Sequence, residues 1–167
     1  MLIYLHSNDW RISFIKLPSI TWKKYTSKLR TYSILKTTPG FETYLSEIQH
    51  IDQRIALTKF RLSNHCLRIE TGRHERIEKN KRFCPFCPNQ IEDEKHALLK
   101  CETYKIHRTD LFCSLEMNLL TSTNTNRDLS LFKVLLTHPT YQAFIAKYLD
   151  RIFSCREFLL KNHRNHI

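Results

Sequence analysis

The chain has 167 residues, enough for one compact domain or two small ones, and its hydrophobic content of 41% excludes a disordered chain. Twenty-seven basic residues against 16 acidic ones give a formal charge of +11, which indicates a polyanionic partner such as nucleic acid or an anionic membrane. With only 2 glycines and abundant Leu, Ile, Lys, Arg and Glu, the composition favours helices over a β-sandwich or a glycine-rich phosphate loop.

The first part of the chain divides at Pro39-Gly40. Residues 1–40 form a poorly defined segment in which aromatic and basic residues mix, suited either to nucleic-acid contact or to a solvated helix face. Residues 41–75 predict a basic helical region. Apolar residues at steps of three and four predict one amphipathic helix from 41 to 55 and a second helical piece from 55 to 62. Thr71-Gly72 predicts a turn within this region.

The second part begins with a predicted zinc-binding knuckle domain over residues 76–112. A C-terminal helical region is predicted over 113–167, from helical patterns near 106–120, 129–136 and 141–160. Pro139 is predicted to begin the last helix. Its expected apolar stripe consists of Tyr141, Phe144, Tyr148, Ile152 and Leu159.

Membrane insertion and secretion are not expected. No apolar run approaches the roughly 20 residues that a spanning helix needs, and the first residues lack the features of a signal peptide. We therefore expect an intracellular protein of the nucleus or cytoplasm that does not contact membranes. In such a reducing compartment, the 6 cysteines indicate metal ligands or free thiols rather than a disulfide framework.

The cysteine spacing predicts a zinc site. Cys84 and Cys87 form a C-x2-C turn, the usual two-ligand half of a structural zinc site, and His96 and Cys101 follow with the spacing x8-H-x4-C. Three sulfurs and one imidazole nitrogen complete a tetrahedron around Zn²⁺ without an open position, which is typical of structural rather than catalytic sites. The alternatives are unrelated buried thiols beside a surface histidine, or His74 or His107 as a substitute ligand.

The second half of the site has a geometric constraint. Asp93 is expected to cap a short helix with Glu94 in its first turn. On an α-helix, residues five apart point about 140° away from each other, so His96 and Cys101 could not share a metal. We therefore expect the helix to end near Lys100, with Cys101 swinging back from the exit turn.

The remaining cysteines and the acidic residues near the ligands have simpler predicted roles. Cys66, Cys113 and Cys155 lie in apolar or helical stretches and are expected to be small core residues. The carboxylates at 92–94 could bind a divalent ion, but helix capping is the preferred interpretation.

A basic stretch precedes the cysteines directly. Between residues 54 and 82 there are nine basic residues and three acidic ones. We expect the basic residues to contact the phosphates of nucleic acid; they are Arg54, Lys59, Arg61, Arg68, Arg73, Arg76, Lys79, Lys81 and Arg82. Phe83 and Phe86 are expected either to stack on bases or to pack over the metal.

Four segments resemble the carboxy-terminal zinc-binding region of non-LTR (LINE-type) retrotransposon reverse transcriptases. They are RIALTKFRLS (54–63), IETGR (69–73), CPFC (84–87) and EDEKHALLKC (92–101). The resemblance covers about residues 41–112 and implies that the region holds template RNA or target DNA during reverse transcription. The family's metal ligands match Cys84, Cys87, His96 and Cys101. The chain departs from the family at Glu102, where proline is expected, and it has no adjacent Asp-Asp pair for polymerase metals.

The sequence thus predicts a mostly α-helical chain with a zinc-stabilised Cys-Cys-His-Cys knuckle, built from a short β-turn or hairpin and a short helix. The expected function is binding of RNA or DNA without catalysis in this chain. The alternatives are a protein-interaction module scaffolded by zinc, a nuclease using Glu92, Asp93 or His96, and a transposon-derived fragment without a function.

Overall fold

The computed structural model describes residues 29–36, 40–116 and 125–164, so most of the predicted segment 1–40 lies outside the described residues. The first helices are α1 (Arg30–Leu35), α2 (Tyr44–Glu47), α3 (Ile51–Arg61) and α4 (Arg68–His74). Three short helical turns follow, η2 (Lys79–Lys81), η3 (His96–Lys100) and η4 (Glu102–Tyr104). The chain ends in α5 (Lys105–Ser114), α6 (Thr125–Thr137) and α7 (Pro139–Arg164). The predicted mostly α-helical fold is confirmed.

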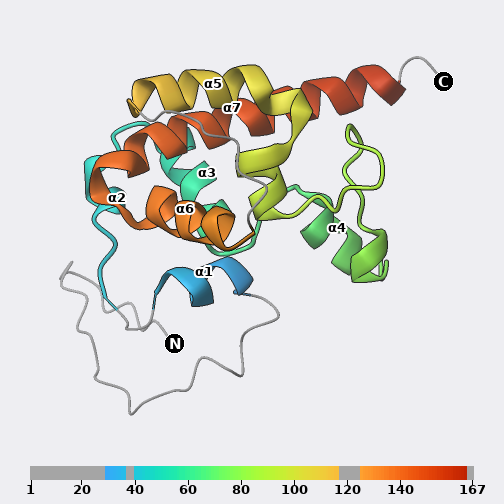
Figure 1. The fold of residues 1–167 in the computed structure, drawn as a ribbon, viewed down its shortest axis with the longest axis horizontal. Helices are drawn as coiled ribbons and strands as arrows, with labels where there is room; N and C mark the ends of the chain where they lie inside the picture. Colours follow the sequence, from blue (N-terminus) through green and yellow to red (C-terminus); the bar gives the residue numbers. More distant parts are fainter. Residues whose placement is uncertain (1–28, 37–39, 117–124, 165–167) are drawn as a thin grey trace, which may run out of the picture.

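Helix α7 is the long central helix of the fold. It runs along the length of the molecule, and α3, α5 and α6 all pack against it (Figure 1). Pro139 begins α7, as predicted, because its fixed φ suits the first helical position. The predicted stripe is correct at Tyr148 and Ile152, which are buried, but wrong at Phe144, which is exposed while Ile145 faces the core.

One hydrophobic core joins the regions that the sequence divides. It contains side chains from α2, α3, α5, α6 and α7 and from residues 84–101, named the metal-ligand segment, in a single cluster. The predicted boundaries at 75/76 and 112/113 therefore do not separate independent cores. The largest fully buried side chains include Leu57, Phe60, Leu98, Tyr104, Phe112, Phe132 and Leu149.

The predicted continuous helix from 41 to 55 is wrong, because the chain breaks between α2 and α3. Ile48 ends α2 with an extended backbone (ψ 108°) and is nevertheless buried in the core. Arg54 lies one turn into α3, and its guanidinium donates a hydrogen bond to the Ile48 carbonyl at 2.9 Å. After the break, α3 buries Ala56, Leu57 and Phe60, whereas Ile51 and Ile55 of the predicted apolar face are exposed.

Gly72 does not form the predicted turn but lies inside α4. A Cβ at this position would lie 2.9 Å from Cγ of Arg82, so only glycine leaves room for that side chain. The chain turns instead at Arg76, whose φ of 59° is left-handed. The Ile77 amide donates to the Gly72 carbonyl at 2.8 Å, which is the six-to-one bond that closes a Schellman-type helix end.

Candidate metal centre

Four side chains converge on one point in the core. The ligand atoms of Cys84, Cys87, His96 and Cys101 all lie within 4.8 Å of one another. The Sγ atom of Cys101 lies 4.0 Å from that of Cys84 and 3.6 Å from that of Cys87. Sulfurs bound at 2.3 Å to one tetrahedral zinc would lie about 3.8 Å apart. The geometry therefore suits a single tetrahedral metal ion, and this group of four is named the metal centre below.

The first two ligands are held by a tight chain reversal. The Gln90 amide donates to the Cys87 carbonyl at 3.2 Å, and the Cys84 amide donates to the Gln90 carbonyl at 2.7 Å. Asn89 supplies the left-handed φ of 60° that this turn requires. An isolated antiparallel bridge joins Phe83 to Ile91 just outside the turn. The linker after Cys87 thus reverses the chain between the two halves of the metal centre.

The second two ligands are brought together by a π-helical turn. Oδ1 of Asp93 accepts a hydrogen bond from the His96 amide at 2.7 Å, which confirms the predicted cap. The helix ends at Lys100, also as predicted. The Cys101 amide donates to the His96 carbonyl at 2.8 Å, five residues back. This wider ring, characteristic of π-helices, places residues five apart near one another, where an α-helix would separate them.

The metal centre is buried, and one of its donor atoms lacks a hydrogen-bond partner. Cys101 is fully buried, and the other three ligands are at most 8% exposed. Nε2 of His96 has no hydrogen-bond partner, although a buried ring nitrogen normally has one. A hydrogen bond between the two sulfurs lowers the pKa of Cys101 and raises that of Cys84, because it favours the thiolate at Cys101 and the thiol at Cys84. Metal coordination would satisfy all these groups at once.

The donor set restricts which metal can bind. Three thiolates and one imidazole suit zinc or another soft divalent ion and are unsuitable for magnesium or calcium, which prefer oxygen ligands. Within the described part of the chain, this is the only cluster of potential metal ligands, and it includes neither His74 nor His107. The prediction that these four residues can hold a metal is therefore supported by their placement.

Helices α5 and α7 support the metal centre from behind. Arg108 of α5 donates to the Cys101 carbonyl at 2.8 Å, and the Tyr148 hydroxyl of α7 donates to the Ala97 carbonyl at 2.8 Å. Arg156 of α7 forms two hydrogen bonds to the buried carboxylate of Glu92, at 2.8 and 2.9 Å. Sequence reasoning missed these supporting residues, because nothing near them in the chain marks their distant partners.

The acidic residues at 92–94 each have a structural partner. Glu92 binds Arg156 and accepts the Arg68 amide at 2.6 Å. Glu94 accepts from Arg30 at 2.7 Å and pairs with His65 at 3.0 Å. Burial alone would raise the pKa of Glu94, but the hydrogen bond and charge of His65 and the charge of Arg30 outweigh it and lower this pKa to about 2. These contacts favour the structural interpretation over a divalent-ion site.

Several arginines that were predicted to contact phosphates instead bind groups within the protein. Arg61 is 3% exposed, donates to the Leu136 carbonyl and to Glu42, and lies over the Tyr44 ring. Its predicted role at the surface is therefore wrong, because packing encloses its guanidinium. Arg54 is half-buried and bonds to the carbonyls of Leu45 and Ile48.

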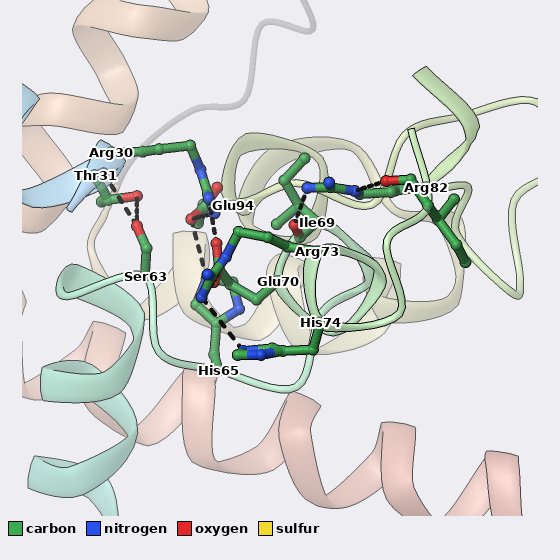
Figure 2. Close-up of polar contacts among 11 residues, drawn as sticks. Arg30, Thr31, Ser63, His65, Ile69, Glu70, Arg73, His74, Arg82 and Glu94 are labelled. Carbon is green, nitrogen blue, oxygen red and sulfur yellow. Dashed lines mark hydrogen bonds and ion pairs between the residues drawn. The ribbon is translucent and has the colours of Figure 1, made fainter. Parts of the chain in front are cut away.

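Three further arginines are partly engaged within the chain. Arg73 pairs with Glu70 at 2.9 Å, and Arg82 donates to the Ile69 carbonyl at 2.7 Å (Figure 2). Arg68 pairs with Glu75 at 2.7 Å. In Figure 2 the carboxylate of Glu70 lies between Arg30 and Arg73, and that of Glu94 lies between Arg30 and His65, so part of the positive charge in this region is neutralised locally.

The remaining predicted cations lie on the surface. Lys59, Arg76 and Lys79 are exposed, and their side chains form no ion pair or hydrogen bond within the described part of the chain. Lys81 is exposed and pairs with Glu78 at 3.0 Å, where both side chains are about two-thirds exposed. Such a surface pair is weak and easily exchanged for a phosphate. Residues 76–82 are named the basic segment below. Its cations Arg76, Lys79 and Lys81 face solvent immediately before the metal centre, whereas Arg82 is bound to backbone carbonyls.

The two phenylalanines of the cysteine turn have different surroundings. Phe86 packs edge-on against Tyr104, with ring centroids 6.4 Å apart, and so covers the core. Phe83 is 43% exposed. The expectation that all three remaining cysteines lie in the core is wrong for Cys66 and Cys113, which are exposed, while Cys155 is half-buried.

Comparisons with protein-family models, with curated proteins and with solved structures found no match to this chain. The resemblance to the reverse-transcriptase zinc region therefore stays a prediction from the quoted segments. Among the described helices, none combines the length and the apolar character that crossing a membrane requires.

Proposed function

We propose that this chain is a zinc-dependent nucleic-acid-binding domain that does not itself catalyse a reaction. The observation that carries the proposal is the direct continuity between the exposed basic segment and the buried metal centre. Lys81 lies only three residues before the first ligand, Cys84. The resemblance to the tail of LINE-type reverse transcriptases, whose ligand pattern the four residues match, also implies binding of nucleic acid.

Zinc is the metal that we propose. A Cys3His set is common in structural zinc sites, and its sulfur separations here suit the zinc–sulfur bond length. Because the protein supplies all four donors, no position remains for water or substrate, so the ion would serve structure rather than chemistry. Bound zinc would fix the turn at 84–91 and with it the end of the basic segment.

The basic segment would bind phosphates through charge. Arg76, Lys79 and Lys81 are exposed cations within six residues of one another, and each phosphate contact releases condensed counterions. Log K should therefore fall linearly with log salt, with roughly 0.7–0.9 units of slope per contact. Lys59, on α3, is a further candidate contact.

The test compares two variants that lose the same charge from different surfaces. The first carries Arg76→Gln, Lys79→Gln and Lys81→Gln. The matched control carries Lys133→Gln, Lys147→Gln and Arg151→Gln, which also removes two exposed lysines and one exposed arginine, but from α6 and α7. Labelled RNA and DNA are titrated at several salt concentrations. We expect the first variant to flatten the slope by about two units or more, and the control by less than one unit.

Equal effects of the two variants would contradict a localised binding surface and leave only general attraction by a protein of charge +11. Absence of salt-dependent binding by the intact chain would contradict the proposed function altogether. That second result would favour the alternative of a protein-interaction module scaffolded by zinc.

A further inference from the structure

We infer that the partner is a single-stranded nucleic acid, and that Phe83 stacks on one of its bases; this inference rests on the proposed function. The starting point is the contrast between two aromatic residues three positions apart. Phe86 turns inward onto Tyr104, whereas Phe83 is 43% exposed and has no aromatic neighbour within the described ranges. An exposed ring costs free energy in water unless something covers it.

The backbone on both sides of Phe83 is fixed. Phe83 pairs with Ile91 in the antiparallel bridge, and the Cys84 amide bonds to the Gln90 carbonyl at 2.7 Å. On the other side, the Arg82 carbonyl accepts the Glu92 amide at 3.0 Å. Side chains alternate in direction along an extended segment, so the inward sulfur of Cys84 dictates an outward ring at Phe83. The ring is thus presented by a backbone that loses little freedom on binding.

Phe83 also directly follows the basic segment. From Lys79 to Phe83 the chain spans four residues, at most roughly 14 Å when fully extended. One short strand can therefore place phosphates beside Lys79 and Lys81 and a base against Phe83. Cations that follow a backbone, combined with an aromatic ring for the bases, are the combination that single-strand binding proteins use.

A duplex fits this surface poorly. In a duplex the base faces are covered by their neighbours, so a protein ring can stack only where a base is unstacked. Residues 76–83 contain only the three-residue turn η2 and no helix long enough to enter a major groove. The arrangement therefore favours a single strand, RNA or DNA, over duplex nucleic acid.

The experiment measures binding of the full zinc-loaded chain to a labelled single strand, as RNA and as DNA, and to the matched duplex. Variants are Phe83→Ala, Phe83→Tyr and the control Phe144→Ala, whose ring is 40% exposed on the N-terminal half of α7. We expect the intact chain to prefer the single strand. Phe83→Ala should weaken single-strand binding by about 5- to 150-fold, the range for one stacked base. Phe83→Tyr and Phe144→Ala should bind normally.

The salt slope separates stacking from charge. Phe83→Ala removes no cation, so the slope should stay unchanged while the affinity falls. If Phe83→Ala binds the single strand as tightly as the intact chain, or weakens single strand and duplex equally, the inference is overturned while the proposed function stands. A preference of the intact chain for duplex also overturns it. Loss of salt-dependent binding in the intact chain overturns the proposed function instead.

A second measurement does not depend on the alanine variant folding. Phe83→Trp is made together with Trp10→Phe and Trp22→Phe, which leaves one tryptophan in the chain. Stacking of a base on this ring should quench its fluorescence when the single strand is added. Binding without any change in fluorescence would overturn the inference.

Discussion

Arg82 shows how a single basic residue can be structural. Its Nε atom donates to the Ile77 carbonyl at 2.9 Å, and Nη1 donates to the Ile69 carbonyl at 2.7 Å. Its aliphatic stem lies against Gly72, where a Cβ would approach Cγ to 2.9 Å and Cδ to 3.1 Å. The residue thereby fastens the end of the basic segment to α4, and glycine is required for the approach.

We expect Gly72→Ala to destabilise the protein. Alanine gains about 1 kcal/mol of helix propensity over glycine, but overpacking against a fixed side chain costs roughly 1–3 kcal/mol. Urea unfolding measures the difference. The control is Gly40→Ala, because a Cβ there meets only the end of the Lys36 side chain, with Nζ at 3.7 Å and Cε at 4.0 Å.

The sign of this effect depends on Arg82. In an Arg82→Ala background the stem is gone, so Gly72→Ala should become neutral or stabilising by helix propensity alone. Equal destabilisation in both backgrounds would show that the two residues do not interact in the way described.

Residue charge alone did not predict which cations face solvent. Arg61 and Arg82 belong to the same basic run as Arg76 and Lys79, and nothing in their local sequence distinguishes them. What distinguishes them is a hydrogen bond to a backbone carbonyl elsewhere in the chain. Arg61 binds the carbonyl of Leu136, and Arg82 binds that of Ile69. By contrast, the four metal ligands were predictable, because their spacing is itself the chemical pattern.

At the scale of elements, α7 and the metal-ligand segment are joined by a buried ion pair. Glu92 is fully buried, and Arg156 reaches it with two hydrogen bonds of 2.8 and 2.9 Å. Glu92 also receives the Arg68 amide at the start of α4. This pair therefore connects α4, the chain between the cysteines, and the last helix.

Arg156→Met should destabilise the protein by about 3–5 kcal/mol, because it leaves a buried carboxylate without its cation. The matched control is Arg151→Met on the exposed side of the same helix, expected to change stability by less than about 0.5 kcal/mol. Adding Glu92→Gln to Arg156→Met should recover part of the loss, since it removes the uncompensated charge. Similar unfolding midpoints for Arg156→Met and Arg151→Met would contradict this role.

Periodicity predicted the long elements better than their interruptions. Helix α7 follows Pro139 and the apolar repeat closely, whereas the break at Ile48 preserves the same three- and four-residue spacing and cannot be seen in it. The turn around His96 was predicted only in part. On an α-helix Cys101 would point away from His96, so the sequence predicted that Cys101 leaves the helix. In the structure a hydrogen bond from the Cys101 amide to the fifth residue back brings the two ligands together instead.

At the scale of the whole molecule, the metal centre belongs to the main core. Cys84, Cys87 and Cys101 share one cluster with Leu98, Tyr104 and the buried face of α7. The composition indicated a polyanionic partner from the total charge. Internal ion pairs engage Arg30, Arg73 and Arg156, whereas Arg76, Lys79 and Lys81 stay exposed next to the metal centre, and further exposed cations lie on α3, α5, α6 and α7. The proposed function therefore requires a metal that fixes one end of the basic segment.

Native mass spectrometry of the full chain, purified from zinc-replete expression, tests that central claim most directly. We expect one zinc ion per folded chain. Cys101→Ser should lose it, because Cys101 lies close to two other ligand sulfurs, whereas the control Cys113→Ser, an exposed cysteine on α5, should retain it. A folded intact chain without metal, or a Cys101→Ser variant that still carries one zinc ion, would contradict the account.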